Sequence, residues 1–234
     1  MKVGIFGIEG WLSGKANLVD KRLEELKQVF NSAKKAYIQV ELITDQEKLK
    51  EADGIIAPEG LRADLILTDL EFVELRIARS ENEPEKKLFM NFKEQLDKES
   101  FLSELALNEE EQRIISGYPL LTVKPIFLAS PQALEDKDRF LLLAYNYFGY
   151  ISFFTTNERQ ARAWSIRKNS SAWEAAGCIH SDIQKGFIRA EAMNSQDLIN
   201  DGGLNQARSN NHLRLENKDY IVEDGDWIFF RFNK

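Results

Sequence analysis

The stretch that decides the fold is residues 150–194, YISFFTTNERQARAWSIRKNSSAWEAAGCIHSDIQKGFIRAEAMN. In its middle, Ser171–His180 is predicted to be a helix, because serine is a favourable N-cap and Glu174 lies in the first turn. Runs rich in aromatic and β-branched residues flank this helix and predict short strands at Ile151–Thr156, Ala161–Arg167 and Phe187–Met193. The stretch therefore encodes two strands, a helix and a third strand, in that order.

Two further segments toward the C-terminus have strand character. Leu213–Leu215 predicts a short strand, and Tyr220–Phe232 predicts a hairpin, because Asp224-Gly225 fits a tight type I′ turn. Two strands, a helix and further strands follow one another in the order of a β-grasp, or ubiquitin-like, module. We therefore expect residues 150–234 to form a β-grasp domain.

The N-terminal residues predict a small α/β unit. Lys2–Ile8 has the Val, Ile and Phe content of a buried strand, and the glycines that follow it suggest a loop that connects this strand to a helix. Apolar periodicity then predicts a helix from Asn17, a strand at Tyr37–Thr44, a short helix at Gln46–Ala52 and a strand at Gly54–Ala57. This β-α-β-α-β order indicates a parallel sheet, which we expect to have about four strands.

The middle of the chain predicts an antiparallel helical hairpin. Residues 62–80 place their apolar side chains on one helical stripe, and a second amphipathic helix follows Pro84. Asn108 and Glu111 have the spacing of a capping box. We expect a strand at Leu120–Ala129, a domain boundary at 131–135 and a helix at Phe140–Phe148. The predicted domains are an α/β domain (1–60 and 118–149), a helical hairpin arm (61–117) and the β-grasp domain (150–234).

Composition excludes several classes of protein. The chain has 234 residues, 31 Lys plus Arg and 38 Asp plus Glu, and a single cysteine, Cys178. A lone cysteine excludes disulfides within the chain and cysteine zinc clusters, so we expect a reducing, cytoplasmic location. No run reaches the roughly 18 apolar residues of a membrane span. Residues 150–234 contain 11 basic and 11 acidic side chains, so residues 1–149 carry the whole net charge of −7.

Several motifs in the C-terminal region carry a resemblance to a known family. They are Arg162–Lys168 (RAWSIRK), Ala175–Asp182 (AAGCIHSD), Lys185–Glu191 (KGFIRAE), Lys218–Asp226 (KDYIVEDGD) and Phe229–Asn233 (FFRFN). Together they closely resemble the C-terminal TGS domain of the YchF/Obg-like ATPases. Upstream, Leu107–Pro125 and Leu65–Ile77 are similar to the end and the start of that family's helical arm. The resemblance implies a shortened relative with a degenerate G domain.

The nucleotide-binding motif of that family is not intact in this chain. A P-loop needs Gly-x-x-x-x-Gly-Lys-Ser/Thr, so that backbone N–H groups surround the β-phosphate and a hydroxyl reaches Mg²⁺. Here Gly7 lies seven positions before Gly14, Gly10 lies only four before it, and Ala16 replaces the hydroxyl after Lys15. Asp45 follows the second strand without the glycine of an Asp-x-x-Gly switch. Ser130-Pro131 replaces the asparagine that would select the base.

We therefore expect no catalytic residue, no metal and no bound cofactor. The alternative is weak ATP or GTP binding through Gly7, Gly10, Gly14 and Lys15, as an anion site at a helix N-terminus. Cys178 and His180 lie two residues apart and point to different faces, so neither a metal site nor a Cys/His nucleophile is expected from them.

A partner or RNA is the other candidate ligand, because guanidinium and indole groups stack on bases while cations meet phosphates. The candidate residues for such a surface are Trp164, Arg167, Lys168, His180, Lys185, Arg189 and Arg231. The alternative is that Trp164 lies half in the core and that the charges only solvate the outer face of the sheet. The aromatic residues Phe229, Phe230 and Phe232 are expected in the core.

The resemblance implies a ribosome- or RNA-linked role. The first hypothesis is therefore a non-catalytic, cytoplasmic binding or regulatory module, whose TGS domain contacts a ribosome, an RNA or a protein partner. The alternative is a weak ATP- or GTP-binding protein of the YchF family. We expect no membrane partner.

Overall fold

The computed structural model describes residues 1–130 and 136–233, which form a mixed α/β fold with two sheets. The chain divides into two compact units. Unit 1 contains Met1–Ala16 and Val40–Lys137, and unit 2 contains Asn17–Gln39 and the residues from Asp138 onward. The boundary expected at 131–135 lies outside the described residues. No described helix combines the length and the apolar character needed to span a bilayer.

The first sheet has five strands in the order β2-β4-β1-β5-β6. Strand β1 pairs in parallel with β4 and β5, and β5 pairs in parallel with β6, as the sequence predicts. The central strands are buried, with Val3, Ile55 and Ile56 fully excluded from solvent. The strands are β1 (Lys2–Ile5), β2 (Gly14–Leu18), β4 (Ile38–Ile43), β5 (Gly54–Pro58) and β6 (Ile126–Ala129). Strand β2 is the additional one, beyond the four expected.

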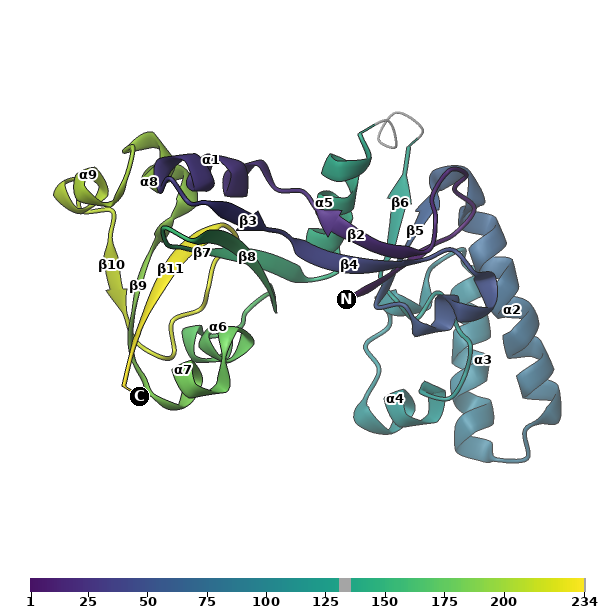
Figure 1. The fold of residues 1–234 in the computed structure, drawn as a ribbon. Helices are drawn as coiled ribbons and strands as arrows, with labels where there is room; N and C mark the ends of the chain where they lie inside the picture. The colour runs from purple at the N-terminus through teal and green to yellow at the C-terminus, as the bar shows by residue number, and fades with distance from the viewer. Residues whose placement is uncertain (131–135, 234) are drawn as a thin grey trace. The chain divides into compact units, whose positions relative to one another are not determined.

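Helices α2 (Arg62–Arg79) and α3 (Glu83–Asp97) of unit 1 lie side by side and confirm the predicted helical hairpin (Figure 1). Their shared face buries Val73, Phe89 and Phe92. The predicted capping box opens α4, where Asn108 Oδ1 accepts two backbone N–H groups of the first turn. The remaining short helices are η1 (Gln46–Glu51), η2 (Glu59–Leu61), η3 (Leu102–Glu104) and α4 (Glu109–Ile115).

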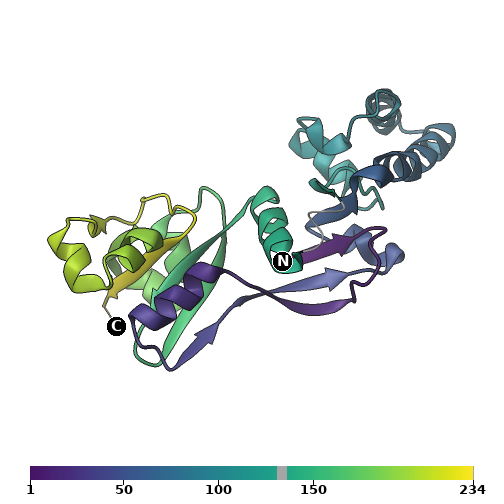
Figure 2. The same ribbon diagram turned by 90° about the horizontal axis from the view of Figure 1, so that it is seen from above.

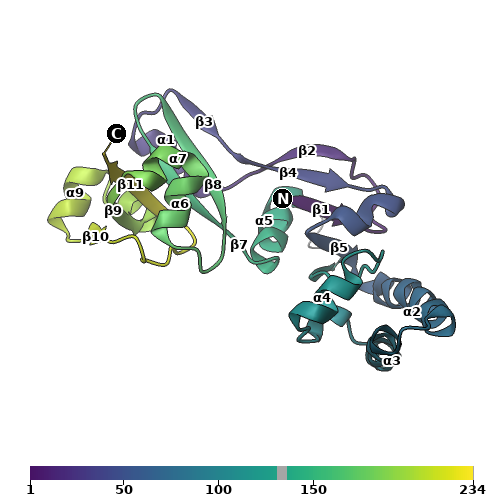
Figure 3. The ribbon, with the colours of Figure 1, turned by 90° about the horizontal axis from the view of Figure 1, so that it is seen from below.

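The second sheet has six strands in the order β10-β9-β11-β7-β8-β3. Helix α6 (Ala172–Ile179) lies on one face of this sheet (Figure 3), and α1 (Lys21–Val29) lies on the opposite face (Figure 2). The strands are β3 (Lys34–Ala36), β7 (Tyr150–Thr156), β8 (Gln160–Arg167), β9 (Phe187–Asn194), β10 (Arg214–Glu216) and β11 (Asp226–Phe232). The helices of unit 2 are α1 (Lys21–Val29), α5 (Lys137–Tyr147), α6 (Ala172–Ile179), α7 (Ser181–Lys185), α8 (Ser195–Asn200) and α9 (Leu204–Ser209). The first residue of α5, Lys137, belongs to unit 1.

The segment that contains α1 and β3 belongs to unit 2, whereas we expected it in the N-terminal α/β domain. Strand β3 adds to the sheet in parallel with β8. Helix α1 is held by an ion pair of 2.9 Å between Arg22 and Asp224, and the Phe30 ring after it stacks on Trp227 at 5.8 Å. Residues nearly two hundred positions apart thus share one core.

Two predicted strands differ from the structure. The hairpin at Tyr220–Phe232 is wrong: β11 pairs with β9 and β7, and Ile221 forms only an isolated bridge with Ser171. The predicted strand Leu120–Ala129 is reduced to β6, because the turn before it is held by buried Asp69. That carboxylate accepts the backbone N–H groups of Leu121 and Thr122 at 2.7–3.1 Å.

Candidate functional site

The glycine-rich loop of unit 1 leads into a strand. Gly14 and Lys15 are the first residues of β2, and the next helix begins only at Lys21, where Asp20 caps α1. The expected strand-to-helix connection is therefore wrong. An anion site of the P-loop type depends on the free N–H groups of a helix N-terminus, and none lies at Gly14-Lys15.

The same loop makes several bonds with its own unit. Lys137 Nζ donates to the carbonyl oxygen of Gly10 at 3.0 Å and lies 5.6 Å from the ring centre of Trp11. The hydroxyl of Ser13 bonds to Thr44 Oγ1 at 2.7 Å and accepts the Thr44 N–H at 3.0 Å. These contacts hold the loop against other parts of unit 1.

Gly7 and Asp45 also have structural roles here. Gly7 has φ 64°, and a Cβ at this position would overlap Leu61. Asp45, which stands where a switch aspartate would, accepts the N–H of Glu47 at 3.1 Å and caps η1. Lys15 itself is exposed on β2.

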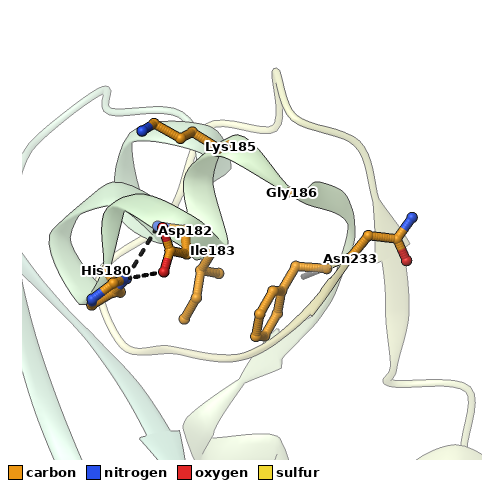
Figure 4. Close-up of a pocket in the computed structure, with 7 residues that line it drawn as sticks. His180, Asp182, Ile183, Lys185, Gly186 and Asn233 are labelled. Atoms are coloured by element: carbon orange, nitrogen blue, oxygen red, sulfur yellow. Dashed lines mark hydrogen bonds and ion pairs between the residues drawn. The ribbon is translucent and has the colours of Figure 1, made fainter.

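In unit 2, the predicted residues His180 and Lys185 line one open pocket of about 850 Å³ (Figure 4). His180 caps α7, because its Nδ1 accepts the backbone N–H of Asp182 at 3.1 Å. The Asp182 carboxylate lies 3.4 Å from the same nitrogen. The other lining residues are Ile183, Gly186, Phe232 and Asn233. The pocket thus joins apolar side chains to an imidazole and a carboxylate, whereas the side chain of Lys185 points away from them (Figure 4).

The pocket depends on the close approach of two backbones. The N–H of Asn233 donates to the Gly186 carbonyl at 2.9 Å, and the Gly186 N–H donates to Asp182 at 2.9 Å. A Cβ on Gly186 would overlap the carbonyl oxygen of Asn233. Glycine is therefore needed here for space, because its φ of −88° is open to any residue.

Trp164, Arg167 and Lys168 lie at β8 and are separate from this pocket. Trp164 is half-buried: its Nε1 donates to Thr155 Oγ1 at 2.9 Å, and the Arg162 guanidinium lies 4.0 Å from its ring centre. The Arg167 guanidinium lies 3.9 Å from the ring centre of Tyr150. The expectation that Trp164 is half in the core is confirmed, and both residues already have partners within the chain.

Arg189 and Arg231 are brought together, because they are directly opposite on β9 and β11. Arg231 Nε donates to the buried carboxylate of Glu191 at 2.8 Å, and Arg208 approaches the same carboxylate at 3.4 Å. The predicted partner-binding residues are thus distributed over three places. Arg208 and Glu191 were absent from the prediction, because the place of Glu191 follows from the register of β9 on β11, and that of Arg208 follows from the packing of helix α9 (Leu204–Ser209).

The aromatic residues of β11 do not all lie in the core. Phe230 is buried at 7% exposure, as expected, whereas Phe229 is 51% and Phe232 is 36% exposed. The expectation for Phe229 and Phe232 is therefore wrong. Strand alternation places Phe229 and Phe230 on opposite faces of the sheet, but the sequence alone does not show how much of each face is covered by a helix.

Comparisons with known proteins support one family. Residues 150–233 match the family model YchF-GTPase_C, described as Protein of unknown function (DUF933). The Ribosome-binding ATPase YchF of Bacillus subtilis is 28% identical over an alignment 298 positions long, which covers 98% of this chain and 80% of that protein. Human Obg-like ATPase 1 is 48% identical over 81 residues, which are 35% of this chain and only 20% of that protein. In fold, the chain is similar to the Schizosaccharomyces pombe YchF GTPase, with a TM-score of 0.72, 18% identity, and coverage of 99% of this chain and 97% of the other.

Proposed function

Because the chain belongs to the YchF family, we propose that it is a non-catalytic binding module that associates with ribosomes through unit 2. Two relatives carry the name Ribosome-binding ATPase YchF, from Bacillus subtilis and Haemophilus ducreyi. The observation that carries the proposal is the contrast between residues 150–233, which match the family model, and the glycine loop of unit 1, which enters strand β2.

Three positions in unit 1 lack the features that a P-loop enzyme needs for nucleotide hydrolysis. Gly14-Lys15 has no helix N-terminus, Ala16 offers no hydroxyl to Mg²⁺, and Asp45 is engaged as a helix cap. Phosphoryl transfer depends on positioning and electrostatic stabilisation by several groups at once. Losing three of them in one site leaves no basis for standard catalysis.

We further propose that residues 150–233 form the TGS domain of the family, with a β-grasp arrangement. The support is helix α6 packed on a mixed sheet, in which β11 pairs in parallel with β7 and antiparallel with β9. Ala172, Ala175 and Ala176 of α6 pack with Ile228 and other sheet residues in one core cluster. This domain presents the candidate contact residues and is the proposed ribosome-facing part.

Co-sedimentation tests the partner. The protein at fixed concentration is centrifuged with purified ribosomes at low and at moderate salt, alongside a gel-shift arm with structured RNA. Binding that survives moderate salt supports specific docking, whereas binding lost there indicates phosphate contacts alone. If the protein neither pellets with ribosomes nor shifts RNA at low salt, the proposed partner class is wrong.

A second candidate function is weak binding of ATP or GTP, favoured by the word ATPase in the names of the relatives and by exposed Lys15. Calorimetry with ATP, GTP and their diphosphates, with and without Mg²⁺, decides this. A ligand that binds the folded state also raises the melting temperature. Absence of heat at millimolar nucleotide rejects this alternative, and measured nucleotide turnover rejects the non-catalytic proposal.

A further inference from the structure

One face of the second sheet is covered over only part of its area. Around β7 and the start of β11, helix α1 covers this face: Arg22 lies 5.4 Å from the ring centre of Phe154, and Phe30 stacks on Trp227. Phe229 lies on the same face as Trp227, because it is two residues further along β11. Yet Phe229 is 51% exposed. The part of this face that the α1 segment covers therefore ends between Trp227 and Phe229.

Strand register extends the uncovered area across β9 and β10. Glu191 of β9 is opposite both Phe229 of β11 and Leu215 of β10, so these three side chains share one face. Leu215 is 59% exposed, whereas Glu191 is 4% exposed between its two apolar neighbours. Arg189 and Arg231 form the next opposite pair on this face.

The charges of this area favour an anionic ligand. The area contains three arginines, Arg189, Arg208 and Arg231, and one carboxylate, Glu191, which is buried and ion-paired with Arg208 and Arg231. In the described part of the chain, no carboxylate lies within ion-pair distance of Arg189. The area has an excess of positive charge although the whole chain has a net charge of −7.

We propose that the surface formed by Phe229, Leu215, Arg189, Arg208 and Arg231, here called the Phe229 face, binds single-stranded RNA. A base stacks on the exposed ring of Phe229, and the arginines meet the phosphates on either side of it. The inference rests on the proposed function and names the surface and ligand class for it. Trp164 takes no part, because it packs beside Phe153 in the core cluster on the α6 side of the sheet. Arg167 takes no part, because its strand β8 is separated from β11 by β7.

RNA fits this surface better than a peptide does. The exposed polar side chains of the Phe229 face are the guanidinium groups of its three arginines, which suit phosphates, and the exposed ring suits a base. A peptide that extends a sheet uses the backbone of an edge strand, and the nearest edge strand, β10, has only three residues.

Fluorescence anisotropy of a labelled oligouridine with the full chain at low salt tests the proposal. Phe229→Ala should weaken binding by about tenfold, because one base–aromatic stack is lost. Phe229→Tyr should bind like the wild type, since it retains the ring. Arg189→Ala should reduce the slope of log affinity against log salt by about 0.7, because one phosphate contact is lost. Arg159→Ala and Trp173→Ala are matched controls at exposed positions outside the Phe229 face, and both should bind like the wild type.

Three outcomes overturn the proposal. It is wrong if Phe229→Ala binds oligouridine like the wild type while circular dichroism shows it folded, or if the wild type does not bind at all. It is also wrong if Phe229→Ala and Phe229→Tyr fail equally, because the ring would then not be what matters. Ribosome pelleting separates this inference from the proposed function: wild-type pelleting without oligouridine binding refutes the Phe229 face as an RNA site and leaves the ribosome proposal standing.

Discussion

In unit 1, the loop after β1 bonds to its own chain: Lys137 reaches Gly10, and Ser13 reaches Thr44. In unit 2, the Phe229 face leaves an aromatic ring and three arginines open to solvent. Both units nevertheless have dense apolar cores. The comparison teaches that a loop can change its sequence and contacts while its scaffold persists, because the core and not the loop supplies most of the stability.

The largest expected effect tests the scaffold of unit 1. Asp69→Ala should lower the free energy of unfolding by about 3 kcal/mol, because the buried N–H groups of Leu121 and Thr122 lose their acceptor. Urea unfolding followed by circular dichroism measures it. Glu71→Ala, exposed on the same helix, is the control and should stay within about 0.5 kcal/mol of the wild type. A loss for Asp69→Ala no larger than the control's would show that unit 1 is not held by this buried bond.

The second effect belongs to unit 2. Gly186→Ala should destabilise by about 2 kcal/mol, because its methyl group meets the backbone of Asn233 and forces a shift. Gly177→Ala is the matched control: its methyl group meets only the flexible side chain of Gln184, and alanine favours helix α6. Thermal melting should therefore separate the two variants. Equal melting temperatures would remove the close approach as a requirement of the pocket.

These features differ in how far sequence alone predicts them. The capping boxes at Asn108 and Ser171 were predictable, because side chain and backbone meet within three residues. The hairpin at Asp224-Gly225 failed, because a favourable turn does not decide which strand β11 joins. Strand β2 has weak strand propensity and is fixed by its pairing with β4.

The sequence predicted the types of the candidate site residues better than their positions in the fold. Arg189 and Arg231 were named from their charge, but their places opposite each other, and the ion pair of Arg231 with Glu191, depend on strand register. Phe229 was assigned to the core because a run of apolar residues does not reveal where α1 ends its cover. That limit is long-range packing, which a local pattern does not contain.

The third effect is a pH dependence within unit 1. Hydroxyl groups of Ser80 and Tyr118, together with the Arg76 guanidinium, lower the pKa of Glu85 to about 2 from an ordinary 4.5. A lowered folded-state pKa stabilises the folded state above pH 4.5, and that stabilisation is lost as the pH falls from 4.5 toward 2.

Glu85→Gln should therefore be less stable than the wild type at neutral pH, and the difference should shrink in acid. Urea unfolding at neutral pH and near pH 2 measures both values. Asp226 in unit 2 gives the opposite sign, because burial raises its pKa, and so Asp226→Asn should lose relative stability in acid. A pH-independent difference for Glu85→Gln would contradict the ion-pair network.

The last prediction concerns Lys15 of unit 1, whose substitution should have no measurable effect. Lys15→Ala should leave the melting temperature, ribosome pelleting and any nucleotide response unchanged, because Lys15 is an exposed residue of β2 with no helix N-terminus beside it. Differential scanning fluorimetry with and without ATP and Mg²⁺ is the measurement. A wild-type shift with ATP that disappears in Lys15→Ala would break the comparison, because the loop would then still serve a ligand.

The position of β11 in its sheet has a consequence for synthesis on the ribosome. This strand lies between β9 and β7, yet it is the last of the six to be translated. The segment that contains α1 emerges about two hundred residues earlier, so Arg22 and Phe30 lack their partners Asp224 and Trp227 until then. The nascent chain therefore holds β10-β9 and β7-β8-β3 as two separate halves, and a late strand must insert between them. Such non-local closure is slow, and it makes completion of unit 2 a late event in the life of each new chain.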